Sequence, residues 1–436
     1  AKELTGKGLK TLLLDRGPMV RHRVDYHNEG RAPFNRPYRG EWPPGLNAED
    51  YSLSWHDAYP FANNDTLNPY IDNEDKPFDW IRSDMFGGRS ILWGRQCYRW
   101  SDLDFEANKK DGHGIDWPIR YRDIAPWYSH VEKFVGVSGE KLGLPQLPDG
   151  EFLPPMSLNV AEQHFKQAIN EHFDGRPVTI GRTANLTEAM PEQGRAPCQY
   201  RSQCHRGCSF GAPFSTQGST LPAAEKTGNL TTRADALVES LEYDATRSRI
   251  IGVRVIDTKT RERSVIRSRI VFLCASTIAS TQILLNSRSE AAPNGIGNNH
   301  DVLGRYLMDH TFGTGATGVI PGYEDKVEFG RRPTGMYVPR FRNIDGQDSD
   351  ADLVRGYNYQ TWAPYRKEPK DFSGFGADLK NHLRIPGPWI INLHAFCEVL
   401  PRKENRMMLD DKRVDRFGVP QVKFDVTWRD NEKNML

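Results

Sequence analysis

The chain opens with AKELTGKGLKTLLLDRGP (residues 1–18), and this stretch decides the fold class. Ala1–Leu4 is predicted to be the last turn of a helix that Gly6 and Gly8 end, since glycine readily takes the left-handed conformation that follows a helix. Leu9–Leu14 is then an apolar run of strand length. This order of helix end, tight turn and strand predicts one half of a βαβ unit and therefore an α/β fold.

The strand is followed by Asp15, Arg16 and Gly17. In a dinucleotide-binding βαβ unit, an acid at this strand tip accepts hydrogen bonds from a ribose hydroxyl. Any βαβ crossover with an acidic strand end gives the same pattern, so the tip alone does not identify a ligand. The other half of the unit, a strand and a G-x-G-x-x-G turn, is expected before residue 1. Gly6-Lys7-Gly8 does not supply it, because Thr11 stands where the third glycine belongs.

Composition excludes several classes of protein. The 436 residues predict two or three domains, and a hydrophobic share of 37% with 26% charged residues is typical of a globular protein. A formal net charge of +1 gives no indication of nucleic-acid binding. No apolar run approaches the ~20 residues that span a bilayer. No signal peptide is recognised, and DVTWRDNEKNML (residues 425–436) stops as a polar turn leads into an expected helix, so we expect a fragment that lacks pieces at both termini.

Two later segments are expected near a ligand. Gly87-Gly88, with Ser90 and Gly94 after it, lets backbone amides approach an anion closely, although a plain turn that enters a helix is an equal alternative. Residues 230–268 alternate in polarity and predict a β-meander, which feeds a buried strand at Ile270–Ala275. Ala275-Ser276 then precedes a helix N-terminus, the position where an open α/β sheet binds its ligand.

Three of the six cysteines crowd into CQYRSQCHRGC (residues 198–208). The residues alone leave three alternatives: a disulfide with one thiol left over, a zinc site, or an iron–sulfur cluster. A structural zinc site needs a fourth ligand, and His205 directly follows Cys204, so both side chains rarely face one ion. A disulfide leaves an odd thiol in a basic loop. A cluster uses all three thiolates, and nearby arginines would offset its negative charge.

The six cysteines fall into two groups with different expected roles. The cluster ligands would be Cys198, Cys204 and Cys208, with Arg195, Arg201 and Arg206 as the offsetting charges. Cys97, Cys274 and Cys397 are expected to be buried small hydrophobes.

Six stretches, in order along the chain, carry a resemblance to one family. They are LKTLLLDRG, GGRSILWG, DWPIRYRDIAPWYSHVEKFVGVSG, the meander that ends in FLCASTIASTQILLNS, GRYLMDH and LPRKENRMMLDDKRVDRFGVPQVKFDV. The chain resembles the bacterial glucose–methanol–choline (GMC) oxidoreductases, which use FAD to oxidise alcohols and sugars. Within that family it is most similar to the large subunits of bacterial glucose, gluconate and glucoside 3-dehydrogenases.

The resemblance implies two domains. Residues 1–310 would form a discontinuous, Rossmann-like FAD-binding domain, truncated at its first βα unit, with a surface excursion at 19–80 and the cysteine loop at 195–212. Residues 311–436 would form a mostly antiparallel substrate-binding sheet domain.

The resemblance also implies the FAD contacts. They are Asp15, Arg16, Gly87, Gly88, Ser90, Trp93, Gly94, Val238, Ala275 and Ser276. The acid would bind the adenosine ribose, the glycine turn would follow the pyrophosphate and isoalloxazine, and Val238 would touch adenine through its backbone. Leu92 stands where some pyranose oxidases place a flavin-linking histidine, so non-covalent FAD is expected.

The implied catalytic histidine and its histidine or asparagine partner are expected beyond Leu436, so no catalytic base is assigned and this chain is expected to be inactive alone. His300, His310 and His394 are expected to be structural. The three clustered cysteines would hold a 3Fe-4S cluster, and electrons would pass singly to a cytochrome c or quinone, with a small accessory subunit as partner.

The compartment stays open. A periplasmic or membrane-peripheral site is favoured by the resemblance, and a cytoplasmic one is an alternative. Alternative functions are an oxygen-using sugar oxidase without a cluster, a nicotinamide-dependent dehydrogenase and a non-catalytic electron-transfer subunit.

Overall fold

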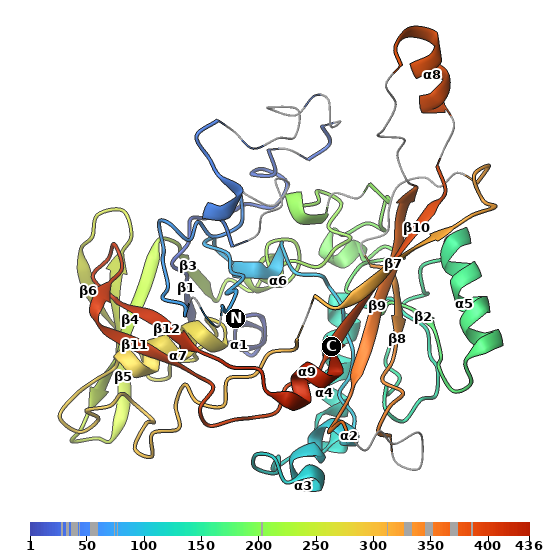
Figure 1. Cartoon of the computed structure of the whole chain (residues 1–436). Helices are drawn as coiled ribbons and strands as arrows, with labels where there is room; N and C mark the ends of the chain where they lie inside the picture. Colours follow the sequence, from blue (N-terminus) through green and yellow to red (C-terminus); the bar gives the residue numbers. More distant parts are fainter. Residues whose placement is uncertain are drawn as a thin grey trace.

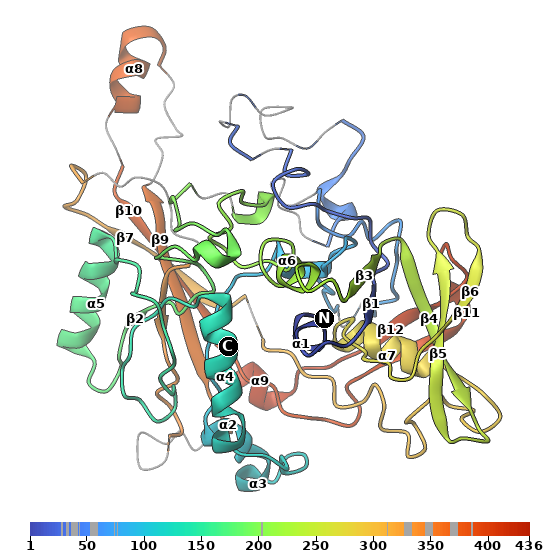
Figure 2. The ribbon, with the colours of Figure 1, turned by 180° about the vertical axis from the view of Figure 1, so that it is seen from behind.

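The computed structural model describes residues 1–27, 29–31, 35, 42, 44–52, 60–73, 75, 77–201, 204–311, 313–326, 334–344, 352–366, 374–384 and 387–436. About a third of the expected excursion at 19–80 lies outside these residues. Figure 1 shows one group of strands around β1 and β4, and a separate, larger sheet on the opposite side of the molecule. Seen from behind in Figure 2, α4 and α6 lie between the two groups.

The opening stretch folds as its sequence predicts. Helix α1 (Lys2–Gly6) ends before Gly8, which has a φ of 80°, and strand β1 (Thr11–Leu14) follows. β1 pairs in parallel with β3 (Leu230–Arg233), and α6 (Thr220–Glu225) precedes β3 and packs beside α1. Parallel strands with helices beside them, α6 directly before β3, confirm the predicted α/β class.

The predicted meander is also confirmed. It is a three-stranded antiparallel sheet of β4 (Ala236–Asp244), β5 (Arg249–Asp257) and β6 (Arg263–Arg267). Helix α7 (Thr277–Asn286) packs on β4, and Leu14 of β1 shares their apolar core. The hairpin of β11 (Arg406–Val414) and β12 (Pro420–Asp425) packs on the other side of α7 through Met407, Val422 and Phe424.

The buried strand expected at Ile270–Ala275 is wrong for this structure. The segment is neither strand nor helix, and Phe272 is 61% exposed. An apolar run becomes a strand only where a neighbouring strand accepts its backbone hydrogen bonds. Among the described residues, β1 pairs only with β3, and no strand reaches this segment. Cys274, expected to be buried, is accordingly exposed, whereas Cys397 is buried as predicted.

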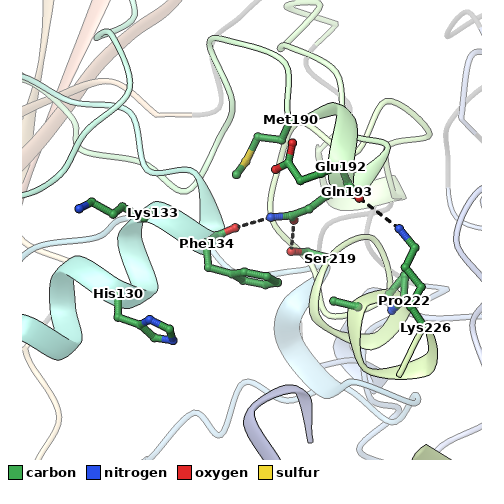
Figure 3. Close-up of a pocket in the computed structure, with 10 residues that line it drawn as sticks. His130, Lys133, Phe134, Met190, Glu192, Gln193, Ser219, Pro222 and Lys226 are labelled. Carbon is green, nitrogen blue, oxygen red and sulfur yellow. Dashed lines mark hydrogen bonds between the residues drawn. The ribbon is translucent and has the colours of Figure 1, made fainter. Parts of the chain in front are cut away.

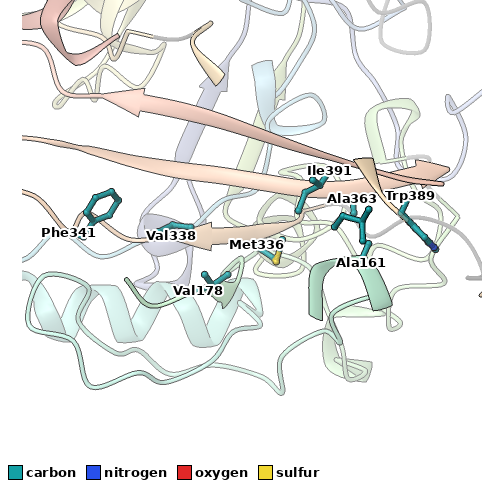
Figure 4. Packing of buried hydrophobic residues seen from close by; sticks show 9 residues of the cluster. Ala161, Val178, Met336, Val338, Phe341, Ala363, Trp389 and Ile391 are labelled. Carbon is teal, nitrogen blue, oxygen red and sulfur yellow. The ribbon is translucent and has the colours of Figure 1, made fainter. Parts of the chain in front are cut away.

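The second sheet has five strands in the order β2-β8-β9-β10-β7, all antiparallel. The strands are β2 (Thr179–Ile180), β7 (Gly315–Ile320), β8 (Met336–Val338), β9 (Tyr357–Arg366) and β10 (Trp389–Cys397). Helix α5 (Val160–His172) covers one face, where Ala161 shares an apolar core with Met336, Val338 and Ile391 (Figure 4). The antiparallel sheet predicted for the C-terminal part is therefore present.

Elements from both sides of residue 310 contribute to each group of strands. β2 and α5 precede that residue yet belong to the five-stranded sheet, and the β11–β12 hairpin follows it yet packs on α7. The proposed division at residue 310 stays a prediction.

Shorter elements complete the described chain. They are helices α2 (Asp102–Phe105), α3 (Ala107–Asp111), α4 (Tyr121–Val135), α8 (Gly376–Arg384) and α9 (Asp430–Met435), with 3-10 turns at Ala48–Asp50, Gly88–Ser90, Pro191–Gln193 and Cys204–Arg206. None of the helices in the described part of the chain has the length and apolar character to cross a bilayer.

Candidate active site

The tip of β1, at Asp15 to Gly17, meets the glycine turn formed by Gly87 and Gly88, although Asp15 and Gly87 are 72 residues apart. The Asp15 carboxylate accepts hydrogen bonds from the Gly17 and Gly87 backbone N–H groups, at 3.0 and 2.8 Å. Gly17 lies so close to Met85 that an added Cβ would fall 2.3 Å from the Met85 Cα. Burial raises the pKa of Asp15, and these two N–H bonds only partly oppose the shift.

The glycine turn has one closed and one open side. Gly87 and Gly88 have φ values of 90° and 56°, which glycine adopts without strain. A Cβ on Gly87 would lie 2.4 Å from the Thr216 hydroxyl, whereas one on Gly88 would meet nothing within 4 Å. The open side at Gly88 is where an anion can approach the backbone.

A polar turn at Thr216 and Gln217 supports the glycine turn. The Ser90 hydroxyl lies 2.6 Å from the Thr216 hydroxyl and donates to Gln217 Oε1 at 3.2 Å. Gln217 in turn donates to the Phe86 carbonyl at 2.5 Å. Sequence reasoning missed these two residues. Their signal was three hydrogen-bonding side chains before a glycine in FSTQG, but nothing local shows which segment they meet.

The other predicted contacts have their own local partners. The Trp93 indole donates to the Phe214 carbonyl at 3.1 Å, and Arg16 binds Asp84. Val238 is on β4, in the core that Leu14 also enters. A Cβ on Gly94 would only touch Gln96, at 4.0 Å.

Ala275 and Ser276 are exposed, and no strand leads to them. Ser276 has a φ of 84° and caps α7 without a side-chain hydrogen bond. The structure therefore brings Asp15, Gly87 and Ser90 together, but it does not give Ala275-Ser276 the strand-end position that was expected.

The three clustered cysteines are free thiols in one loop. Burial raises the pKa of Cys198 to about 11, and the nearby thiols of Cys204 and Cys208 add to the shift. The Tyr200 N–H lies 3.4 Å from the Cys198 sulfur, and Arg201 lies 3.6 Å from the Cys208 sulfur. Across the described residues, no three His, Cys, Asp or Glu side chains are arranged to hold a metal ion.

Buried charges surround this loop. Glu29 accepts hydrogen bonds from Arg201 and from the Ser209 backbone and hydroxyl. Arg95 is only 2% exposed; burial lowers its pKa, and the opposing charges come from Cys204, Cys208 and Tyr26.

Arg195 is one of the three arginines predicted to offset the charge of a cluster, and that role stays a prediction. Its guanidinium donates to the carbonyls of Val135, Gly211 and Ala212. A guanidinium carries five N–H donors in a fixed fork, so one side chain can bind several carbonyls at once. Arg195 therefore links the start of the cysteine loop to the residues that follow the loop and to the end of α4.

A separate cavity of about 440 Å³ lies between α4 and α6 (Figure 3). Gln193 donates to the Phe134 carbonyl at 2.8 Å and accepts from the Ser219 hydroxyl at 2.8 Å, while Lys226 donates to the Glu192 carbonyl at 3.1 Å. None of the predicted site residues lines this cavity. Its polar groups bond to one another and so join α4 to the segment that leads into α6.

The family model for GMC oxidoreductase matches residues 71–312, which include the glycine turn, the cysteine loop and the meander. The chain belongs to the GMC oxidoreductase family. It is therefore an oxidoreductase that acts on CH–OH donors, as its resemblance implied.

Relatives of this GMC oxidoreductase extend over nearly the whole chain. The fructose dehydrogenase large subunit of Gluconobacter japonicus is 26% identical over 98% of this chain and 77% of that protein. The 2-methyl-1,2-propanediol dehydrogenase of Mycolicibacterium austroafricanum is 25% identical over 99% and 75%. The solved structure of pyridoxine 4-oxidase from Mesorbium loti covers 95% of this chain and 70% of its own, at 14% identity and a TM-score of 0.49.

GMC membership implies FAD, and the junction at β1 fits its adenosine diphosphate part. An ionised carboxylate offers about four lone-pair positions, so Asp15 can still accept from a ribose beyond its two N–H bonds. The open side at Gly88 fits a phosphate next to it. The roles of individual residues in binding FAD stay predictions.

Proposed function

We propose that this GMC oxidoreductase oxidises a CH–OH group of a sugar or related alcohol to a carbonyl, with non-covalent FAD, and passes the electrons through an iron–sulfur cluster to a cytochrome or quinone. The observation that carries the proposal is the contact of the Asp15 carboxylate with the Gly87 backbone in a GMC chain. It supports a ribose-binding role for Asp15, since the open glycine, Gly88, directly follows Gly87. When bound, FAD supplies the hydride acceptor for alcohol oxidation.

The chain's own residues have two tasks in this proposal. Asp15 orients the nucleotide, because its position is fixed by two backbone bonds before any ligand arrives. Arg89 follows Gly88 in the same turn and would bring a positive charge to a phosphate bound beside it.

Arg95 supports the cluster part of the proposal. A buried cation needs nearby negative charge, and the groups that oppose the burial effect on Arg95 include the Cys204 and Cys208 thiols. Thiolates that ligate iron carry that charge permanently, with backbone N–H bonds to the sulfurs such as the one from Tyr200. The proposal requires the three sulfurs to converge when iron binds, since they are not arranged as a metal site here.

The fructose dehydrogenase relative is named as a large subunit, and this name supports a small accessory subunit as a partner of this chain. A periplasmic or membrane-peripheral location belongs to the same proposal.

The flavin part is tested by purifying the intact gene product and its Asp15→Ala variant under the same conditions. Wild type is expected to be yellow, with flavin absorption bleached anaerobically by a sugar, and the variant to lose most of its flavin. Asp116→Ala is the matched control, because Asp116 pairs with Arg120 on the surface. A colourless wild-type protein that reduces nicotinamide instead would contradict the proposal.

The cluster part is tested by iron and acid-labile sulfide content after anaerobic purification. Cys204→Ser is expected to lose both, whereas Cys97→Ser, outside the loop, is expected to keep them. Iron-free wild type, with peroxide formed as fast as sugar is consumed, would favour the oxidase alternative.

A further inference from the structure

Helix α4 is amphipathic, yet its apolar residues do not all face the protein. On its inner side, Glu132 forms a buried ion pair with Arg99 at 2.6 Å, and Val135 lies in an apolar core. Trp127 and Val131, by contrast, are 64% and 54% exposed. Single exposed apolar side chains are ordinary on a protein surface, so the arrangement of these two decides what they mean.

The outward apolar residues of α4 lie in one line. Val131 follows Trp127 by four residues and Phe134 follows Val131 by three, and side chains at these spacings lie on the same side of a helix. Figure 2 shows α4 on the near side of the molecule in that view. We call Trp127, Val131 and Phe134 the outer stripe of α4.

The outer stripe ends at the cavity between α4 and α6. The Phe134 ring points into this cavity, and the rest of the apolar lining comes from Met190, Pro222 and Ala223 (Figure 3). Its volume of about 440 Å³ lies within the roughly 300–1,000 Å³ typical of pockets that take small molecules. Methionine sulfur makes favourable contacts with aromatic rings. The cavity is therefore suited to an aromatic side chain.

The same stripe carries an aromatic side chain of the size that this cavity can accept. Trp127 precedes Phe134 by seven residues, which is about 10 Å along a helix. Because Trp127 is 64% exposed, it does not fill the cavity of its own chain. A surface that carries both a protruding aromatic ring and a hollow is complementary to itself, as a contact between two identical copies requires.

Two copies of α4 placed antiparallel bring the ring and the hollow together. A twofold axis that passes between His130 and Val131 has Trp127 and Phe134 at equal distances on its two sides. Trp127 of each copy then lies opposite Phe134 of the other, and Val131 lies beside the axis. Packed helices have axes about 8–10 Å apart, so an indole ring on one helix can reach the cavity beside the other.

The charges near the stripe favour a protein partner over a lipid surface. The His130 ring lies 2.9 Å from Glu3 Oε1, and the Lys133 amine lies 3.7 Å from Glu151. Basic groups that stand beside carboxylates do not give the net positive surface that anionic lipids attract. A surface of balanced charge can also meet a copy of itself without strong repulsion.

We propose that this side of α4 is an interface between two copies of the chain, with Trp127 of each copy inserted into the cavity between α4 and α6 of the other. The proposal concerns assembly and depends neither on the reaction nor on the cofactors. It accounts for a helix whose apolar stripe faces water in the single chain.

The first test measures the mass of the intact gene product by light scattering and analytical ultracentrifugation at micromolar concentrations. Wild type is expected to be a dimer. Trp127→Ala is expected to raise the dissociation constant of the dimer by roughly a hundredfold, because tryptophan anchors dominate such contacts and each dimer contains this one twice. Ile115→Ala is the matched control, since Ile115 is 84% exposed and precedes α4, and it is expected to leave the dimer unchanged.

The second test locates the axis with single cysteines. Val131 lies beside the proposed axis, so Val131→Cys is expected to form a disulfide-linked dimer on mild oxidation, since the two Cα atoms come within the roughly 7 Å that a disulfide spans. Arg122→Cys is the control on the same helix, because the axis places its two copies roughly 25 Å apart at 1.5 Å per residue. Wild type oxidised in parallel reports any link through the native cysteines.

The outcomes decide between the possible partners of the stripe. A monomeric wild type overturns the proposal, and so does a dimer that folded Trp127→Ala does not weaken. If Trp127→Ala instead releases a different subunit from the purified protein, the stripe binds that subunit and the proposal is wrong. If Trp127→Ala does not fold, the cross-linking decides, and a Val131→Cys protein that links no better than Arg122→Cys overturns the proposal.

Discussion

The two strand systems of this protein are stabilised in different ways. In the five-stranded sheet, Met336 is 0% exposed beneath α5, and β8, β9 and β10 each pair on both sides. In the β1–β3 pair, Leu12 is 42% exposed, and the tip of β1 is held by the backbone bonds of Asp15 and the close contact of Gly17 with Met85. The sheet depends on apolar burial, whereas the nucleotide end depends on a few polar and steric contacts that also form the site.

Truncation of one apolar side chain in each system tests the difference most strongly. Met336→Ala is expected to lower the free energy of unfolding by about 2–5 kcal/mol, because it leaves a cavity under α5. Leu12→Ala is expected to cost less than about 1 kcal/mol, since much of that side chain is already in water. Chemical denaturation of both variants measures the gap, and equal costs would contradict the comparison.

Gly17→Ala tests the steric contact at the β1 tip. The added methyl would fall 2.3 Å from the Met85 Cα, so the backbone must separate, at an expected cost of about 1–3 kcal/mol together with loss of flavin. Gly6→Ala is the matched control, because nothing lies within 4 Å of its added Cβ and alanine favours the helix end by up to about 1 kcal/mol. A fully stable, flavin-bearing Gly17→Ala protein would show that the tip is not tightly packed.

Titration tests the polar contact at the same tip. Burial raises the folded-state pKa of Asp15 above its usual 3.8, so the folded state favours the protonated acid. That advantage is present below pH 3.8 and is lost as pH rises through the raised pKa. The stability of flavin-free Asp15→Asn relative to wild type is therefore expected to increase with pH over this window. A difference that does not change with pH would mean that Asp15 is not buried.

The smallest effect is expected at the exposed apolar run. Phe272→Ser is expected to change stability by less than about 0.5 kcal/mol, since the ring is mostly in water. The same denaturation series measures it. A cost above about 2 kcal/mol would show that Ile270–Ala275 is a buried strand after all, and that the β1 system is larger than the described pair.

Part of the site could be predicted because its signals are local. The helix end at Gly8, the β1 strand and its acid follow from backbone preferences and from an apolar run within a few residues. The partners of that acid are not local. Thr216 and Gln217 reach the glycine turn across more than 120 residues, and no short pattern shows that they do.

The sequence by itself determined the family, the α/β class, the antiparallel second sheet and the three crowded thiols, since each depends on residue type and order along the chain. Only the tertiary structure decided that Ile270–Ala275 has no strand beside it, that Arg195 binds carbonyls, and that the Asp15 carboxylate meets the Gly87 backbone. These outcomes depend on which distant segments come into contact, because hydrogen bonds and burial are satisfied by neighbours in space.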